Sequence, residues 1–168
     1  MAGVIEVGDG IPSVPVKLVD ASGISDTTSN AVLGAGRVVF FAVPGAFTPT
    51  CHTNHLPGFV ANAAKLKAAG VDRIVCGSVN DHHVMKAWAG ASDALGVIDF
   101  LADGNGQLAA ALGLDKDMSS AGMGTRYVRS ALLIKDGIVE AVFAEDKPGQ
   151  VTTTGASAIL MALAGASV

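Results

Sequence analysis

The residues of this chain best suited to nucleophilic chemistry are its two cysteines, Cys51 and Cys76. Cys51 lies in the segment PGAFTPTCHTNHLPGF (residues 44–59), where Thr48 is a good helix N-cap and Pro49 suits the first helical position. This pattern predicts that Cys51 lies in the first turn of a helix. Free backbone N–H groups and the helix dipole stabilise a thiolate there, and the thiolate is the nucleophilic form of cysteine.

The residues around Cys51 also favour an activated thiol. Thr48 can offer its hydroxyl to the sulfur or to a bound oxygen, and Pro44 and Pro49 stiffen the loop and shield the sulfur. Cys76 lies in the apolar run VDRIVCGSV, where an inert buried thiol is an alternative to a redox role. Two cysteines in 168 residues are not a disulfide scaffold, because a domain of this size builds a sufficient core without one.

The apolar periodicity predicts an α/β fold, with a mixed sheet flanked by helices and residues 1–168 in a single domain. Pro15 should confine the first strand to a sheet edge, and Pro57 should bend or break the helix that follows Cys51. Asp136-Gly137, between two apolar runs, predicts a hairpin. The predicted strands are residues 14–18, 37–43, 71–79, 97–101, 127–134 and 138–143. One predicted helix begins at Pro49 and stops at Gly70, and three others span residues 81–88, 107–112 and 155–163.

The composition excludes several classes of protein. Half of the residues are apolar and 15% are charged, which is typical of a packed globular protein rather than a disordered one. A net charge of −4 gives no basic footprint for nucleic acid. The first residues lack the layout of a secretory signal, and glycines and charges interrupt every long apolar stretch. We therefore expect a cytoplasmic protein with no nucleic-acid or membrane partner.

The pattern P-x-x-x-T-x-x-C, formed by Pro44, Thr48 and Cys51, resembles that of the peroxiredoxins. The segments VPGAFTPTC, HLPGF, SVND, VMKAW and RSALLIKDG resemble the type II, or peroxiredoxin-5, branch and extend the resemblance over nearly the whole chain. The resemblance implies a thioredoxin-like fold with an N-terminal extension and a C-terminal β-hairpin plus helix. It also implies a catalytic set of Cys51, Thr48, Pro44 and Arg129.

The same resemblance implies a thiol-dependent peroxidase for cell redox homeostasis. Such an enzyme reduces hydrogen peroxide and organic hydroperoxides through a sulfenic acid on Cys51, needs no cofactor, forms a homodimer, and is recycled by thioredoxin or by glutaredoxin and glutathione. An arginine stabilises the thiolate and the charge that passes to the leaving oxygen. Arg129 is preferred to Arg126 because the family places its arginine immediately before the apolar run that leads to the Asp-Gly turn.

The resemblance also bears on three further residues near Cys51. His52 stands where the type II branch commonly has serine or another small residue, and it either tunes the thiolate or faces solvent. His55 matches the family's histidine before Pro-Gly-Phe, and we expect it to have a structural role with local hydrogen bonds. Cys76 is a possible resolving cysteine, because some type II peroxiredoxins carry a second cysteine here. A disulfide needs Cα atoms within about 7 Å, so the Cys51 turn would have to unwind.

Three other functions fit part of the pattern. A cysteine hydrolase would need an oxyanion hole that the sequence does not reveal. A non-catalytic thioredoxin-fold redox sensor or chaperone would not need the complete set of Pro44, Thr48, Cys51 and Arg129. A metal site is disfavoured because no C-x-x-C is present. The available soft or borderline ligands are Cys51, His52, His55, Cys76, His82 and His83.

Overall fold

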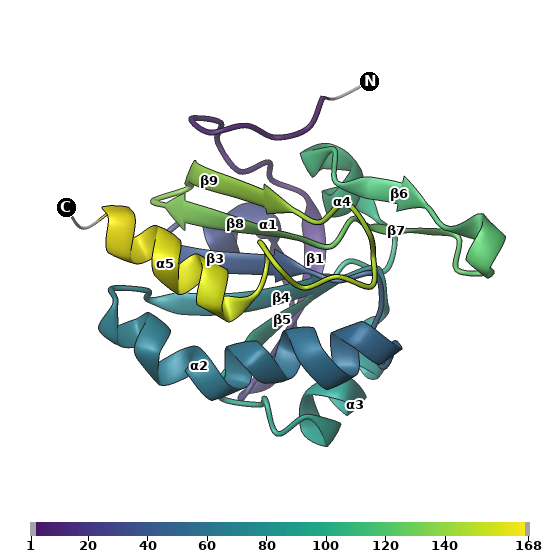
Figure 1. Cartoon of the computed structure of the whole chain (residues 1–168). Helices are drawn as coiled ribbons and strands as arrows, with labels where there is room; N and C mark the ends of the chain where they lie inside the picture. Colours follow the sequence, from purple (N-terminus) through teal and green to yellow (C-terminus); the bar gives the residue numbers. More distant parts are fainter. Residues whose placement is uncertain (1–2, 167–168) are drawn as a thin grey trace.

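A computed structural model describes residues 3–166, which fold around a seven-stranded mixed sheet (Figure 1). In spatial order its strands are β2 (Gly23–Thr28), β1 (Pro15–Asp20), β5 (Asp99–Ala102), β4 (Arg73–Ser78), β3 (Arg37–Ala42), β8 (Ser130–Lys135) and β9 (Ile138–Ala144). A separate two-stranded sheet joins β6 (Asp115–Asp117) to β7 (Thr125–Tyr127). The helices are α1 (Ser29–Leu33), α2 (Leu56–Ala68), α3 (His82–Ala91), α4 (Gln107–Leu112) and α5 (Ala156–Ala166), with short turns η1 (Cys51–His55) and η2 (Ser119–Ala121).

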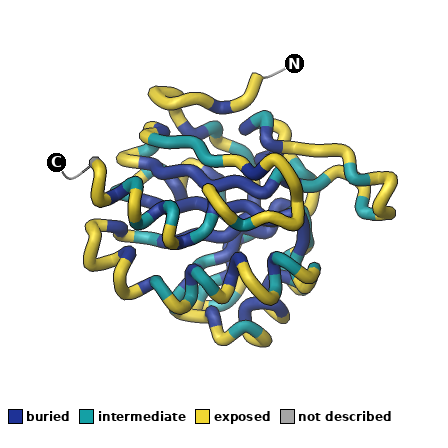
Figure 2. Tube along the Cα trace, in the orientation of Figure 1, coloured by how far each residue is buried: buried dark blue, intermediate teal, exposed yellow. Residues whose placement is uncertain are grey.

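The centre of the sheet is formed by the continuous apolar run that the sequence predicts as a buried strand. β3 pairs in parallel with β4 and antiparallel with β8, and all its residues after Arg37 are buried. A strand covered on both faces needs such a run because neither face meets water. Figure 2 shows the buried strands at the centre, surrounded by exposed loops. The predicted mixed sheet flanked by helices is therefore confirmed.

The helices divide between the two faces of the sheet. One core cluster combines side chains of α2, α3 and α5 with one face of the central strands, and a second combines α1 and α4 with the other face. None of the helices in the part of the chain that the structure describes has the length and apolar character needed to cross a bilayer. The two clusters cover both faces of β3. The loop that carries Cys51 therefore begins at the end of a strand that is packed on both sides.

The first strand differs from its prediction. β1 pairs with β2 on one side and with β5 on the other, so Pro15 does not lie in an edge strand. β5 pairs only with residues 17–19, and the missing N–H of Pro15 therefore interrupts no bond to β5. The edge strand on this side of the sheet is β2, which the sequence does not predict, because GISDTT has no apolar alternation and none of its residues is buried.

The C-terminal hairpin is confirmed, but its first strand is shorter than predicted. Asp136 and Gly137 have φ values of 48° and 81°, as a two-residue type I′ turn requires. The predicted strand 127–134 is divided, because Tyr127 belongs to β7 and β8 begins only at Ser130. Between the two sheets, Val128 donates its N–H to the carbonyl of Leu114 over 2.6 Å. The division leaves Arg129 directly before β8 and outside both strand ladders.

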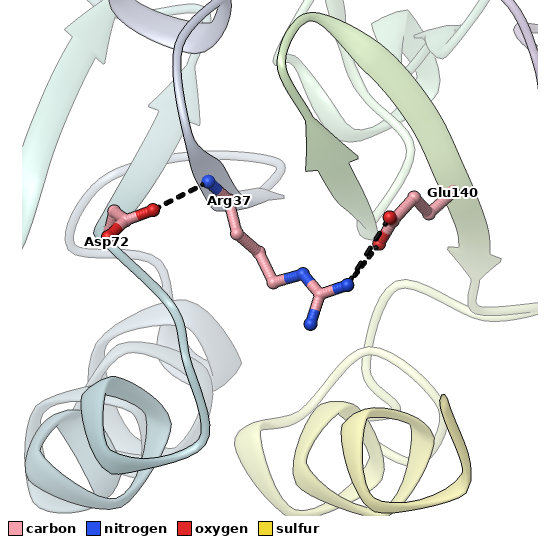
Figure 3. Close-up of polar contacts among 3 residues, drawn as sticks. All are labelled: Arg37, Asp72 and Glu140. Atoms are coloured by element: carbon pink, nitrogen blue, oxygen red, sulfur yellow. Dashed lines mark hydrogen bonds and ion pairs between the residues drawn. The ribbon is translucent and has the colours of Figure 1, made fainter. Parts of the chain in front are cut away.

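Polar contacts of Arg37 hold the start of β3, the end of this strand that is opposite to the Cys51 loop (Figure 3). The backbone N–H of Arg37 donates to Asp72 Oδ2 over 2.8 Å, and Arg37 Nη2 lies 3.3 and 3.2 Å from the two carboxylate oxygens of Glu140. These contacts connect the start of β3 to the turn before β4 and to β9. They lie at the end of the sheet away from Cys51.

Candidate active site

Cys51 begins a turn that is wider than a regular α-helical turn. The N–H of Leu56 donates to the carbonyl of Cys51, five residues earlier, which defines η1 as π-helical. In a regular helix the ring of Pro57 would clash with the carbonyl of Thr53, and Pro57 has no N–H to donate. The widened turn accommodates this proline. The sequence predicts a disturbance at Pro57, but it does not predict that the turn of the cysteine itself widens.

The helix begins where the sequence predicts. Pro49 and Thr50 are helical, and the N–H of His52 donates to the carbonyl of Thr48 over 2.9 Å. The placement of Cys51 in the first turn is therefore confirmed. The Cys51 side chain is fully buried and accepts a hydrogen bond of 3.0 Å from Arg129 Nη2 to Sγ. Arg129, the arginine that the family resemblance assigns to the site, therefore contacts the Cys51 sulfur directly.

Arg129 uses all three of its side-chain nitrogens. Besides the Cys51 contact, Nη1 lies 2.9 Å from His55 Nδ1, and Nε donates to the carbonyl of Pro148 over 2.9 Å. The residue is only 2% exposed. Within residues 3–166, none of the ion pairs involves Arg129. A buried guanidinium without a carboxylate partner favours negative charge on the one anionisable group that it contacts, the Cys51 thiol.

His55 orients Arg129 and is neutral. The guanidinium can only donate, so His55 Nδ1 accepts and Nε2–H donates to the carbonyl of Thr154 over 2.9 Å. Burial is the main reason that the pKa of His55 falls to about 4; the charge of Arg129 also lowers it, while the Thr154 bond and Glu145 oppose the shift. These partners lie 74 and 99 residues away, so the expected local hydrogen bonding is wrong. Only the four-residue spacing from Cys51 hints that both side chains share one side of the turn.

A loop between β9 and α5, residues 145–155, supplies the carbonyls that hold Arg129 and His55; we call it the strap (Figure 1). Buried Glu145 organises it by accepting four hydrogen bonds of 2.6 to 2.9 Å from the N–H and hydroxyl groups of Thr152 and Thr154. Burial alone would raise the pKa of Glu145, but these bonds lower it to about 2. The sequence does not predict the strap, because its contacts join segments that are distant in the chain.

The remaining predicted site residues shape the loop before Cys51. Thr48 donates its hydroxyl to the carbonyl of Gly45 over 2.6 Å, and not to the sulfur, which is one of the two expected acceptors beside a bound oxygen. Buried Pro44 accepts a bond of 3.2 Å at its carbonyl from Arg126 Nη1, and Arg126 Nε donates to the carbonyl of Met123 over 2.8 Å. Arg126 therefore braces this loop, whereas Arg129 contacts the sulfur. Of the two arginines, Arg129 contacts the sulfur and Arg126 does not, and the catalytic role of Arg129 stays a prediction.

Cys76 is a fully buried free thiol in β4, paired in register with Phe41 of β3 and Phe100 of β5. Burial, followed by the influence of Cys51, raises its pKa well above the usual range, although Arg129 acts in the opposite direction. Cys76 is therefore protonated in this conformation. Cys51 and Cys76 belong to the same core cluster but are not bonded to each other.

The histidines near Cys51 are occupied by other partners. His52 Nδ1 accepts a hydrogen bond of 3.1 Å from Trp88 Nε1, so His52 does not merely face solvent. His55 is held by Arg129 and Thr154. In the described part of the chain, no three or more His, Cys, Asp or Glu side chains are grouped so that they could hold a metal ion.

The fold and the arginine-bound thiol define a class, that of the thiol-based redox enzymes built on a thioredoxin-like sheet. A family model described as Redoxin matches residues 6–160. Peroxiredoxin-2E-2, chloroplastic, of Oryza sativa subsp. japonica is 47% identical over 167 residues, covering 95% of this chain and 72% of that protein. Peroxiredoxin-2B of Arabidopsis thaliana is 43% identical, covering 95% and 98%.

Solved structures agree with these sequence matches. Reduced Prx3 from Vibrio vulnificus in complex with H₂O₂ superposes with a TM-score of 0.88 at 39% identity, covering 95% of this chain and 99% of that one. Peroxiredoxin 5 from Alvinella pompejana gives 0.83 at 32% identity, covering 96% and 99%. The chain therefore belongs to the Redoxin family and, within it, to the peroxiredoxins. It is a thiol peroxidase, and neither the hydrolase nor the non-catalytic alternative is favoured.

Proposed function

We propose that Cys51 is the peroxidatic nucleophile of this thiol peroxidase and that Arg129, Thr48 and Pro44 complete the catalytic set. The Cys51 thiolate attacks one oxygen of hydrogen peroxide or an organic hydroperoxide, and the O–O bond breaks. The sulfur is oxidised to a sulfenic acid, and the other oxygen leaves as hydroxide or alkoxide and takes up a proton as water or alcohol. The observation that carries this proposal is the 3.0 Å contact of buried Arg129 with Cys51 Sγ.

Each proposed partner has a distinct task. Arg129 stabilises the thiolate and then the charge that develops on the leaving oxygen, and neutral His55 holds the guanidinium without competing for its charge. Because Thr48 donates its own hydrogen to the carbonyl of Gly45, the lone pairs of Thr48 Oγ1 are free to accept a hydrogen bond from the O–H of the bound peroxide. Pro44 forms part of the wall of the site and accepts the bond from Arg126 that fixes the loop.

Replacing Cys51 by serine tests the nucleophile. The hydroxyl has nearly the shape of the thiol but does not form a nucleophilic anion at neutral pH, so Cys51→Ser should reduce peroxide consumption to the background rate. Cys76→Ser is the matched control for the loss of a buried thiol, and it should retain the first oxidation step. Parent-rate consumption by Cys51→Ser, with an intact fold by circular dichroism, would refute the role of Cys51.

We further propose that Cys76 resolves the sulfenic acid. In this step Cys76–SH and Cys51–SOH condense to a disulfide and water, and an external dithiol later reduces the disulfide. Since Cys76 is buried and protonated in the closed conformation, the step requires the Cys51 turn to unwind. Non-reducing peptide mass spectrometry after one equivalent of peroxide should find a Cys51–Cys76 peptide. A stable sulfenic acid, or only a mixed disulfide with added glutathione, would establish a one-cysteine mechanism instead.

A thioredoxin-type reductant fits the family, and we propose that thioredoxin or glutaredoxin with glutathione recycles the enzyme. We also propose a homodimer, on the family resemblance, and a cytoplasmic location. The relatives include a protein named as chloroplastic and others whose names state no organelle, so cell fractionation is the appropriate test of location. Light scattering of the reduced and oxidised protein tests the dimer.

A further inference from the structure

His52, directly after Cys51, makes a contact that the proposed chemistry does not use. Trp88 Nε1 donates to His52 Nδ1 over 3.1 Å. An indole N–H can only donate, so His52 Nδ1 must be the acceptor and the neutral ring carries its proton on Nε2. Trp88 is fully buried and belongs to α3. The bond therefore connects the turn of Cys51 to a different helix.

The indole of Trp88 is itself anchored in the core and supports both flanks of Cys51. Its ring meets Phe100 of β5 edge-on, with centroids 5.9 Å apart. The ring centroid of Phe47 lies 5.5 Å from that of His52 and 6.5 Å from that of Trp88. Phe47 is 47% exposed and has a φ of 61°, which is unusual for a bulky residue and persists only where neighbours impose it. Phe47, before Cys51, and His52, after it, therefore both interact with the buried side chain of Trp88.

The turn that this contact holds departs from regular α-helical hydrogen bonding. η1 has π-helical hydrogen bonds, and Pro57 contributes no N–H to the turn that follows. While the turn is wound, Cys51 Sγ contacts Arg129. Unwinding moves His52 away from Trp88 and leaves a buried indole N–H without its acceptor, which opposes the opening.

We propose that His52 is a positioning residue whose hydrogen bond with Trp88 holds the Cys51 turn closed. In the oxidised protein, Cys51–SOH condenses with a second thiol to a disulfide and water. Opening of the His52–Trp88 hydrogen bond limits the rate of this step. The kinetic part of this inference rests on the proposed role of Cys51. The structural part does not, because the bond exists in the reduced protein.

Three variants isolate the hydrogen bond from the packing of the rings. His52→Ala removes the acceptor, and Trp88→Phe removes the donor while keeping an aromatic ring. His52→Asn is the conservative rescue, since Asn Oδ1 occupies nearly the position of His Nδ1 and accepts a hydrogen bond. His83→Ala is the matched control, an exposed imidazole at the start of α3.

Amide hydrogen exchange of the reduced protein tests the closed turn without any peroxide. Peptides covering residues 47–59 should exchange about two- to tenfold faster in His52→Ala and Trp88→Phe, which is the range expected for one neutral hydrogen bond. His52→Asn and His83→Ala should match the parent. Trp88 is the only tryptophan, so its fluorescence reports the same bond, and His52→Ala alone among the histidine variants should change the emission. Equal exchange in all variants would overturn the proposal.

The rate of disulfide formation after one equivalent of peroxide tests the consequence. His52→Ala should form the disulfide about two- to tenfold faster than the parent, and His52→Asn should restore the parent rate. If His52→Asn behaves like His52→Ala, the bond is not what holds the turn and the proposal fails. If Cys51 of the parent is not oxidised at all, the proposed peroxidatic role fails, while the exchange data still decide whether the bond holds the turn.

Discussion

Two arginines occupy opposite ends of the ladder between β3 and β8. Arg37 starts β3 and pairs in register with Lys135, whereas Arg129 directly precedes Ser130 at the other end. Arg37 is partly exposed and binds the Glu140 carboxylate. Arg129 is buried and binds a thiol, a neutral imidazole and a carbonyl. Both arginines are held in place, but only the charge of Arg37 is compensated by an acid.

This difference shows what separates a structural arginine from one that can act on a reacting group. A carboxylate beside Arg129 would stabilise the buried charge and would also weaken its effect on the sulfur. The fold avoids this by using uncharged acceptors and by engaging Glu145 with Thr152 and Thr154 instead. The positive charge of Arg129 is therefore left without an acidic partner beside the Cys51 sulfur, as the proposed attack of Cys51 on peroxide requires.

The largest effect is expected when the uncompensated charge is removed. Arg129→Ala should slow oxidation of Cys51 by about 10²- to 10³-fold, the usual result of deleting one preorganised donor to developing charge, or about 2.7–4 kcal/mol of barrier. Arg37→Met should leave the rate within about twofold, because Arg37 is at the far end of the sheet. Stopped-flow oxidation with hydrogen peroxide measures both rates.

Arg126 sharpens the same test, because it lies near the site but contacts only carbonyls. Arg126→Ala should slow oxidation much less than Arg129→Ala does, by loosening the loop at Pro44. Equal losses in Arg126→Ala and Arg129→Ala would mean that contact with the sulfur does not determine which arginine is catalytic.

The neutral partner of Arg129 should give the protein a pH-dependent stability. The folded pKa of His55 is about 4, below the ordinary 6.5, so the unfolded chain binds the extra proton first as the pH falls. The contribution of neutral His55 is complete above pH 6.5 and is lost progressively between pH 6.5 and about 4. Lowering the pH from 7.5 to 5 should therefore reduce the free energy of unfolding by about 2 kcal/mol through this residue.

Urea denaturation of the parent and of His55→Gln at the two pH values measures this contribution. The variant has no imidazole, so its decrease between pH 7.5 and 5 should be smaller than that of the parent by about 2 kcal/mol. Glu145 does not interfere, because its own contribution is lost only as the pH falls from 4.5 toward about 2. The same decrease in both proteins would show that His55 has the same pKa in the folded and the unfolded protein, so that burial beside Arg129 does not lower it.

Local patterns in the sequence predicted the parts of this site that depend on local structure. The apolar run before Pro44 predicts β3, Pro49 predicts the start of the Cys51 helix, and Asp136-Gly137 predicts the hairpin. The choice of Arg129 comes from the family resemblance and not from a local pattern. The partners of His55 and the strap were not predictable, because they join residues 74 and 99 positions apart and the strap has no apolar periodicity. β2 lacks a local signature, and Pro57 signals a disturbed helix without specifying a π-helical turn.

The smallest effect is expected at the compensated end of the ladder. Arg37 Nη2 alone reaches both oxygens of Glu140, the two side chains are 24% and 35% exposed, and the buried Arg37 Nε has no hydrogen-bond partner within residues 3–166. Pairs this exposed contribute about 0–1 kcal/mol, and the unpaired Nε offsets part of that gain. Arg37→Met keeps the apolar stem and the backbone bond to Asp72, so the free energy of unfolding in urea should change by less than about 1 kcal/mol. Glu140→Gln, which retains an oxygen acceptor, should change it less still. A loss of several kcal/mol in Arg37→Met would show that Arg37 and Glu140 behave as a buried ion pair. Arg37 and Arg129 would then differ in the chemical identity of their partners and not in their burial.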